Sequence, residues 1–472
     1  MVYSVNPDGQ ITTDSLDHAV QIAGALRAKR RATKQQRAQV LRRYLREGLR
    51  RGKKPWEILE APLHESVPGA ACAEVQPGRY RVRKSDGSWP ETWVEGWKAV
   101  GAAIADAMHA WPSLSMIIDV FGFTKNDPAG DREKAHSGVF FNPPKEKFPA
   151  RSLRWRWDGV TPRVVLRGRN PDRSHPIVQG LVWQSGSGVE LWGQDIDFCA
   201  AEGASAVIGN PGQVGAMRLL RCDLLRPVDP DQQQSFYGHG FNWGTRTYGG
   251  GLQMTECDWL AQAREHSRYE QNFGFMIAYK SKLGSGGRTN FQGGTRMDTQ
   301  QPESYLGFLV DGCELLDGNS GSGGGGLATS FGFAGPTVIR NTTIRTYAQH
   351  PHNDNQAIAI WEASNYGGVA DPEGDDFATP LLVLHNIVID APYLDRSVIQ
   401  AESFARGYFG NITGNAPKMA IDLGDQWPSG PIGDWFLIDE NVPALRTRTG
   451  KVWHTYSDEE RKARLWKETL EL

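Results

Sequence analysis

The sequence has no stretch of 18 consecutive apolar residues, so no segment has the composition of a membrane-spanning helix. It has no marked excess of charge either: its 472 residues include 52 Lys and Arg and 54 Asp and Glu, a formal net charge of −2. This balance excludes a protein that is basic over its whole surface and binds nucleic acid with it. Residues 1–10 are polar and lack the apolar core of a secretory signal, so we expect synthesis in the cytoplasm without a signal peptide.

Cysteine is scarce, and its pattern excludes a disulfide framework. The five cysteines are odd in number, widely spaced and form no CxxC pair. Such usage is typical of reduced thiols in a chain made in the cytosol. The five are Cys72, Cys199, Cys222, Cys257 and Cys313.

Glycine, in contrast, is abundant. It accounts for 54 of 472 residues, about 11% against a usual ~7%, and it follows no collagen period. Many glycines mean many turns, which favours an all-β architecture over a helical one. The 39% hydrophobic and 10% aromatic content excludes an intrinsically disordered chain.

The charge is unevenly distributed along the chain. Residues 27–54 contain thirteen Lys or Arg and one acid, Glu47, so this segment carries 13 − 1 = +12 and the remainder about −14. The apolar spacing around it predicts a helical hairpin. The basic charges either form a solvated face or make residues 27–54 a docking element for an acidic partner, a nucleic acid or another subunit.

An eight-residue pattern recurs in the middle of the chain. Positions 1, 3 and 8 are apolar, positions 4 and 5 form a bend, and position 6 is small or polar. Clear copies begin at Met217, Leu252 and Phe308, and weaker copies begin at Val189, Met276, Thr337 and Leu381. A repeat that returns every few tens of residues is typical of proteins built from stacked units.

The pattern has a direct physical interpretation. Positions 1 and 3 face one side of a strand, the bend turns the chain, and positions 6 and 8 face inward again from a second strand. One repeat cannot bury its inner face alone, so repeats stack and like residues lie above like. Cys222, Cys257 and Cys313 all occupy position 6. We therefore predict that they form a buried, unbridged ladder.

The repeat, together with the Pro77-Gly78-Arg79-Tyr80 segment, resembles the right-handed parallel β-helix proteins of the pectate-lyase-like superfamily, including phage tailspikes. The resemblance covers roughly residues 160–423. It implies an all-β, right-handed parallel β-helix with an N-terminal helical segment and a C-terminal cap. The expected organisation is a basic helical anchor at 1–60, a mixed α/β N-terminal cap at 61–160, the parallel β-helix at 161–425 and a C-terminal cap with a short helix at 426–472.

The same resemblance suggests a site in the middle of the repeats. Similarity to β-helix lyases implies that His266 or Tyr269 is a base, and that Arg264, Arg288 and Arg296 bind the carboxylate of an anionic glycan. The alternative is a hydrogen-bonded ladder that joins neighbouring repeats. No lyase motif of the superfamily matches this sequence residue by residue.

A hydrolase on this fold would instead need two or three carboxylates on the outer face. Several acidic residues fall near the bends of the pattern, and the alternative for all of them is solvated surface. They are Asp195, Asp197, Glu256, Asp258 and Glu314.

We expect no metal or cofactor, and two segments are the alternatives to this expectation. His350, His352 and Asp354 alternate as metal ligands would on a strand, although Pro351 favours a loop. The acidic residues of 371–376 offer oxygen ligands for Ca²⁺, although a solvated loop is the favoured interpretation.

These observations favour a structural protein over an enzyme. We expect a bacteriophage virion protein, tailspike-like or on the particle surface, that forms a homo-oligomer and binds a host-surface glycan. It would join other virion subunits through residues 27–54 and be found in the virion, or another extracellular particle, after lysis. The alternatives are a polysaccharide lyase or glycoside hydrolase, and a scaffold without a ligand.

The docking hypothesis is tested by truncation. Deleting residues 1–55 should leave a folded protein that no longer joins its assembly, because the deletion removes the +12 segment. Sedimentation of the truncated and full-length chains at physiological salt measures assembly, and circular dichroism checks the fold. Assembly of the truncated chain at full yield would contradict the hypothesis.

Overall fold

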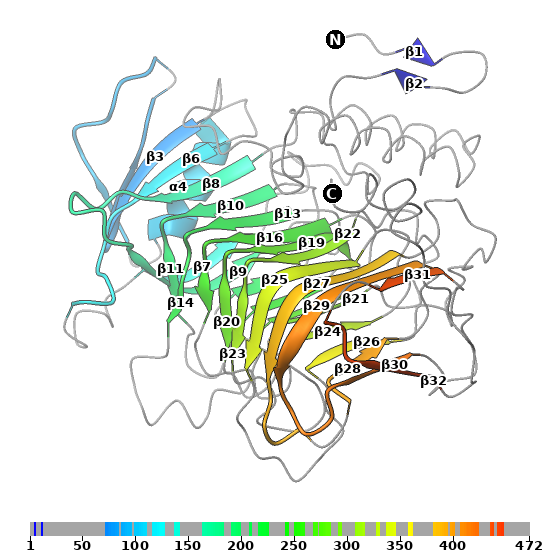
Figure 1. Cartoon of the computed structure of the whole chain (residues 1–472). Coiled ribbons are helices and arrows are strands. Elements are labelled where there is room, and N and C mark those ends of the chain that lie inside the picture. Colours follow the sequence, from blue (N-terminus) through cyan, green and yellow to red (C-terminus); the bar gives the residue numbers. More distant parts are fainter. Residues whose placement is uncertain are drawn as a thin grey trace.

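The structure is a computed structural model, shown in Figure 1. It describes 25 ranges of the chain. They are residues 4–5, 11–12, 71–84, 86–96, 99–110, 116–127, 136–141, 163–183, 190–199, 207–209, 216–225, 241–244, 250–259, 268–271, 273–284, 291–294, 307–316, 327–330, 337–345, 357–361, 381–394, 397–401, 406–423, 435–438 and 441–447.

Strands dominate the described residues, which confirms the all-β prediction. One sheet contains 30 strands, and nearly all of their pairings are parallel. A separate antiparallel pair joins β1 (Ser4–Val5) and β2 (Ile11–Thr12). The predicted basic segment, residues 27–54, lies outside the described residues. No described helix is long and apolar enough to cross a membrane.

The parallel strands form three long ladders, in which each strand pairs with a strand of the next repeat. The first ladder runs through β3 (Ala71–Gln76), β6 (Met116–Val120), β8 (Arg163–Gly168), β10 (Glu190–Gln194), β13 (Ala216–Leu220), β16 (Gly250–Thr255), β19 (Phe273–Tyr279), β22 (Gly307–Asp311), β25 (Thr337–Arg345), β27 (Leu381–Asp390), β29 (Arg406–Asn415) and β31 (Trp435–Ile438). Its order in space follows its order in the sequence, as the colours of Figure 1 show.

The other two ladders follow the same order. The second contains β9 (Ile177–Trp183), β11 (Asp197–Cys199), β14 (Leu224–Leu225), β17 (Asp258–Trp259), β20 (Lys282–Gly284), β23 (Glu314–Leu316) and the second halves of β25, β27 and β29. The third contains β7 (His136–Phe141), β9, β12 (Val207–Gly209), β15 (Phe241–Gly244), β18 (Arg268–Gln271), β21 (Phe291–Gly294), β24 (Leu327–Ser330), β26 (Ile358–Trp361), β28 (Ile399–Ala401), β30 (Ala420–Leu423) and β32 (Ala444–Thr447).

A hairpin and a helix lie at the beginning of the first ladder. The Pro77-Gly78 segment is the bend of an antiparallel hairpin between β3 and β4 (Arg79–Val82), and β5 (Val94–Glu95) pairs with β4. The helix is α4 (Ala99–Ala110). Its buried side chains, at the three- and four-residue spacing of one helix face, are Ala99, Val100, Ala103 and Ala107, and they belong to the main core.

The main core contains the inner positions of the repeat. The clear copies have the predicted register, because Met217 pairs with Leu252, which pairs with Met276 and then Phe308. At position 6, Cys222, Cys257 and Cys313 are at most 1% exposed, and all are free thiols. The predicted cysteine ladder is confirmed, with the buried Ser281 between the last two.

Two of the weaker copies were predicted in the wrong register. Leu191, not Val189, is the partner of Met217, so that copy begins two residues later. Leu382, not Leu381, pairs with Thr337. The second error reverses the faces of the strand: Leu384 is buried, whereas Val388, predicted to face inward, is 43% exposed.

Position 5 lies in the left-handed region in eight successive repeats and makes the bend there. The residues with positive φ at this position are Asp195, Arg221, Glu256, Lys280, Gly312, Asn341, Asn386 and Asn411. Asparagine tolerates this conformation better than most residues. The three asparagines also form a ladder in which Asn411 Nδ2 donates to Asn386 Oδ1 (2.9 Å), and Asn386 Nδ2 donates to Asn341 Oδ1 (2.8 Å).

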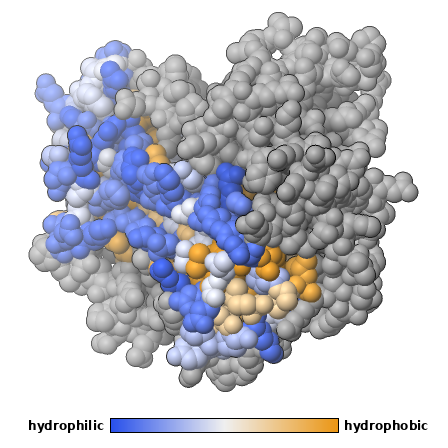
Figure 2. Space-filling view, in the orientation of Figure 1, coloured by the Kyte–Doolittle hydropathy of each residue, from blue (hydrophilic) through white to orange (hydrophobic). Residues whose placement is uncertain are grey.

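The first four residues of this row carry charges of alternating sign: Asp195, Arg221, Glu256 and Lys280. The guanidinium of Arg221 makes two contacts with the Asp195 carboxylate, of 2.6 and 3.0 Å. Because the row is exposed or half-buried, each pair stabilises the fold by no more than about 1 kcal/mol. Figure 2 shows hydrophilic residues over most of the described surface in this view.

Gly168 occupies position 5 of the repeat before the one that contains Asp195. A substitution at Gly168 tests how closely the backbones of neighbouring repeats approach at this position. A Cβ there would lie 1.9 Å from the Asp195 carbonyl oxygen and 2.7 Å from Pro176 Cδ. We expect Gly168→Ala to lower the free energy of unfolding by at least about 2 kcal/mol, because backbone must move to admit the methyl group. Denaturant titration of the variant and the wild type measures this difference in the free energy of unfolding.

The matched control is Gly96→Ala, where no heavy atom lies within 4 Å of the added Cβ. We expect this change to alter stability by less than about 0.5 kcal/mol. Equal stability of the two variants would contradict the close approach at Gly168.

Candidate functional site

A row of carboxylates lies on the outer side of the second ladder. Asp197, Asp223 and Asp258 occupy position 7 in three successive repeats, next to the inward-facing positions 6 and 8. The pairing of Phe198 with Leu224, and of Leu224 with Trp259, sets them in register. Adjacent strands are about 4.8 Å apart, so the three side chains follow one another along the stack.

Two loops bring basic side chains to this row. Residues 121–127 contribute Lys125, and residues 169–176 contribute His175. The side chain of Asn170 joins the loops, because it accepts a hydrogen bond from Gly122 N (3.0 Å) and donates one to Gly122 O (2.9 Å). The loops therefore hold Lys125 and His175 in place over β11.

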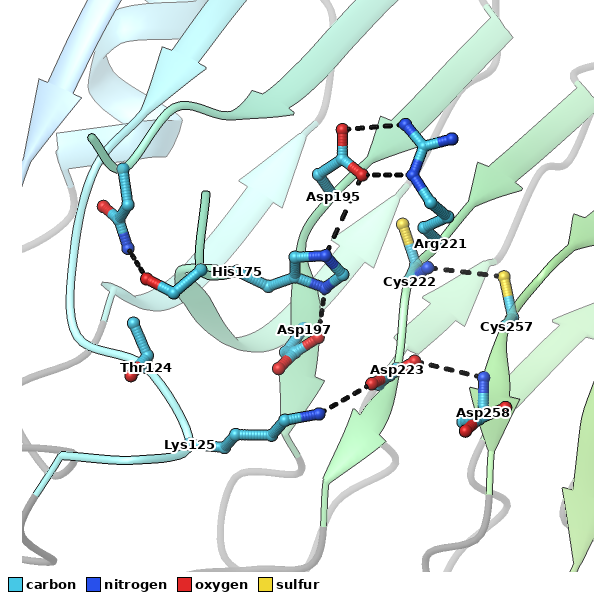
Figure 3. A network of polar contacts seen from close by, with 12 residues as sticks. Thr124, Lys125, His175, Asp195, Asp197, Arg221, Cys222, Asp223, Cys257 and Asp258 are labelled. Atoms are coloured by element: carbon cyan, nitrogen blue, oxygen red, sulfur yellow. Dashed lines mark hydrogen bonds and ion pairs between the residues drawn. The ribbon is translucent and has the colours of Figure 1, made fainter. Parts of the chain in front are cut away.

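His175 lies between two aspartates (Figure 3). Its Nδ1 is 2.9 Å from Asp197 Oδ1, and its Nε2 is 3.8 Å from Asp195 Oδ1. Arg221 contacts Asp195 from the other side, so charges of alternating sign run from Arg221 to Asp197. This chain fixes the orientation of the imidazole ring.

Asp223 lies at the centre of a second set of contacts. Its Oδ2 accepts from Lys125 Nζ at 3.0 Å, and its Oδ1 accepts from the backbone N–H of Asp258 at 3.1 Å. Both contacts hold the Asp223 side chain in place between the loop and the next repeat. The side chain of Lys125 is 52% exposed and that of Asp223 18%, so this end of the site is open to solvent.

The acidic groups of the site differ in how deeply they are buried. Asp197 is 0% exposed, and desolvation raises its pKa, against the opposing hydrogen bond from His175. Desolvation and the nearby Asp223 also raise the pKa of Asp258. The hydrogen bond to Asp197 raises the pKa of His175 and thereby favours the imidazolium. The arrangement thus combines three carboxyl groups, two of them with raised pKa values, and two basic groups within one small site.

The site predicted from the family resemblance is not tested by this arrangement. Arg264, His266, Arg288 and Arg296 lie outside the described residues. Tyr269 lies on β18, where it pairs with Asn242 and Gln292 through the backbone. The two segments named as alternatives for metal binding, 350–354 and 371–376, also lie outside the described residues.

Of the five carboxylates named as candidates from the sequence, two lie on the outer side of the second ladder, Asp197 and Asp258. A third, Asp195, lies in the adjoining bend. Glu256 is in the bend of its own repeat, and Glu314 lies further along the second ladder, beside Lys282. Asp223 was missed, although its recurrence as Asp at position 7 was visible in the sequence. Nothing in the pattern pointed to Lys125 or His175, because both precede the repeats that they contact.

In comparisons with protein families, curated proteins and solved structures, none matched this chain. The functional argument therefore depends on the residues of the site.

The raised pKa of His175 predicts a pH-dependent contribution to stability. The His175–Asp197 interaction is fully present below the unfolded-state pKa of histidine and is lost as the pH rises through the higher folded-state pKa. We expect His175→Asn to cost more stability at pH 5.5 than at pH 8.5. Denaturant titrations of both chains across this interval measure the difference, and a cost that grows with pH would contradict the assignment.

Proposed function

We propose that the three ladders are the faces of a right-handed parallel β-helix. The support is that strands of all three ladders pair in parallel with strands of the next repeat. A chain that returns to each face once per repeat winds around a common axis. Connections between parallel strands are right-handed in about 98% of cases, which gives the hand.

We propose further that the protein is a bacteriophage virion protein, tailspike-like or on the particle surface, that binds a glycan on the outer side of this β-helix. The observation that carries glycan binding is the in-register row of Asp223 and Asp258, held beside Lys125. Carboxylates accept hydrogen bonds from sugar hydroxyls, and an ammonium donates to them. The excess of carboxylates disfavours an anionic ligand, so this site suits a neutral glycan.

The proposal for the virion has separate support in the charge distribution. Residues 27–54 carry a net charge of +12 and the remainder about −14. A basic docking segment and an acidic body that it anchors would have this distribution of charge. Assembly through this segment would produce a homo-oligomer or join the chain to other virion subunits. An anionic glycan at Arg264, Arg288 and Arg296 remains a prediction for a different part of the chain.

A binding experiment tests the glycan site. In a screen of neutral oligosaccharides, we expect Asp223→Asn to weaken binding of any hit by about tenfold or more, because it removes the carboxylate and the ion pair with Lys125. The matched control is Glu95→Gln, an equally charge-reducing change at an exposed residue of β5. Equal affinities of the two variants would contradict the site.

A glycoside hydrolase is the second candidate, and one observation favours it. The pKa of Asp258 is raised, as that of a general acid in glycoside hydrolysis is, and a second carboxyl group, Asp223, lies beside it and bonds Lys125. Two carboxyl groups about one strand spacing apart match the separation of a retaining pair. Release of reducing ends by the wild type, lost in Asp258→Asn while binding remains, would make the protein a hydrolase.

A further inference from the structure

One oxygen of the site is buried without a hydrogen bond. Asp197 is 0% exposed, and its Oδ1 is 2.9 Å from His175 Nδ1. Its Oδ2 is buried and has no hydrogen-bond partner in the part of the chain that the structure describes. A buried carboxylate oxygen left in this state costs free energy, because water no longer solvates it. The neighbours of Asp197 show what would satisfy this oxygen.

Three ligand atoms converge here from separate parts of the chain. They belong to His175 in the loop before β9, Asp197 on β11 and Asp223 in the next repeat, and all lie within 4.8 Å of one another. Ligand atoms around a tetrahedral Zn²⁺ are roughly 3.4 Å apart, given bonds of about 2.0–2.2 Å. Small side-chain rotations would close the set around an ion.

The chemistry of the three donors selects the class of ion. An imidazole nitrogen with two carboxylates suits Zn²⁺ and similar transition metals, whereas Ca²⁺ and Mg²⁺ favour oxygen ligands alone. Two carboxylates and a neutral imidazole carry −2, which balances a divalent cation. Three protein ligands leave a coordination position for water.

The charged side chains around the three ligands are also arranged as a metal site requires. With Nδ1 of His175 directed at the ion, its Nε2–H faces Asp195 at 3.8 Å, and Arg221 holds Asp195 in place. Such a carboxylate behind a histidine ligand orients the ring. The ammonium of Lys125 now lies 3.0 Å from Asp223 Oδ2, and this side chain, being 52% exposed, can move into solvent when a metal ion binds.

We propose that His175, Asp197 and Asp223 bind one divalent transition-metal ion, with Zn²⁺ as the probe, and that Lys125 occupies the position of the cation in its absence. This site contains no residue predicted from the sequence as a metal ligand. It does not depend on glycan binding, because metal affinity is measured directly.

Calorimetric titration of the chelator-treated full-length chain with ZnCl₂ at pH 8 tests the proposal. We expect one Zn²⁺ per chain, bound more tightly than Ca²⁺. Asp197→Asn and His175→Gln should each weaken the site by more than about 100-fold, since removing even a supporting group of a metal site costs 10–100-fold. Lys125→Met should tighten it by up to about fivefold, because it removes a competing cation.

Glu95→Gln serves as the control and should leave the affinity for Zn²⁺ unchanged. Circular dichroism shows which variants fold. If Asp197→Asn does not fold, His175→Gln still tests the site. No stoichiometric binding by the wild type would overturn the proposal. So would tighter binding of Ca²⁺ than Zn²⁺, or Zn²⁺ binding that is unchanged in the folded ligand variants.

Discussion

The in-register parallel pairing of successive repeats determines what each side chain in the ladders can contact. Position 6 of one repeat lies beside position 6 of the next, so the backbone N–H of Cys222 points at the sulfur of Cys257, 3.4 Å away. The same register puts Asp223 beside Asp258 on the outer side. The buried thiols, the asparagine ladder and the acidic row are therefore three results of one pairing.

The sequence predicted this register only where the inner positions were unambiguous. The copy that starts at Leu191 has Gly193 at position 3, where an apolar side chain was expected, because an added Cβ would lie 3.0 Å from Leu219 Cδ2. The strand β27 has apolar residues on both faces, so alternation alone does not fix its register. The left-handed backbone of Asn386 fixes this register, since the left-handed Asn341 and Asn411 occupy position 5 of the neighbouring repeats.

The site was only partly predictable, for a related reason. Its aspartates belong to the repeats and follow from their register. Its basic groups come from loops whose positions depend on tertiary contacts, such as the paired hydrogen bonds between Asn170 and Gly122. A pattern based on the repeats contains no information about which loop lies over which strand. Burial of Asp197, which distinguishes it from Asp223, also appears only once the fold is known.

The alternation of charge along the bends limits how such a protein changes during evolution. Losing the repeat that contains Arg221 would bring Asp195 beside Glu256, and duplicating it would put two guanidiniums side by side. Like charges in contact oppose the stacking that every repeat needs. Gain or loss of repeats in pairs preserves the alternation, whereas gain or loss of single repeats does not. Beyond Gly312, where asparagines replace the charges, single repeats can be added or removed without this penalty. The far end of the stack is therefore the part whose length is free to vary among descendants of this chain.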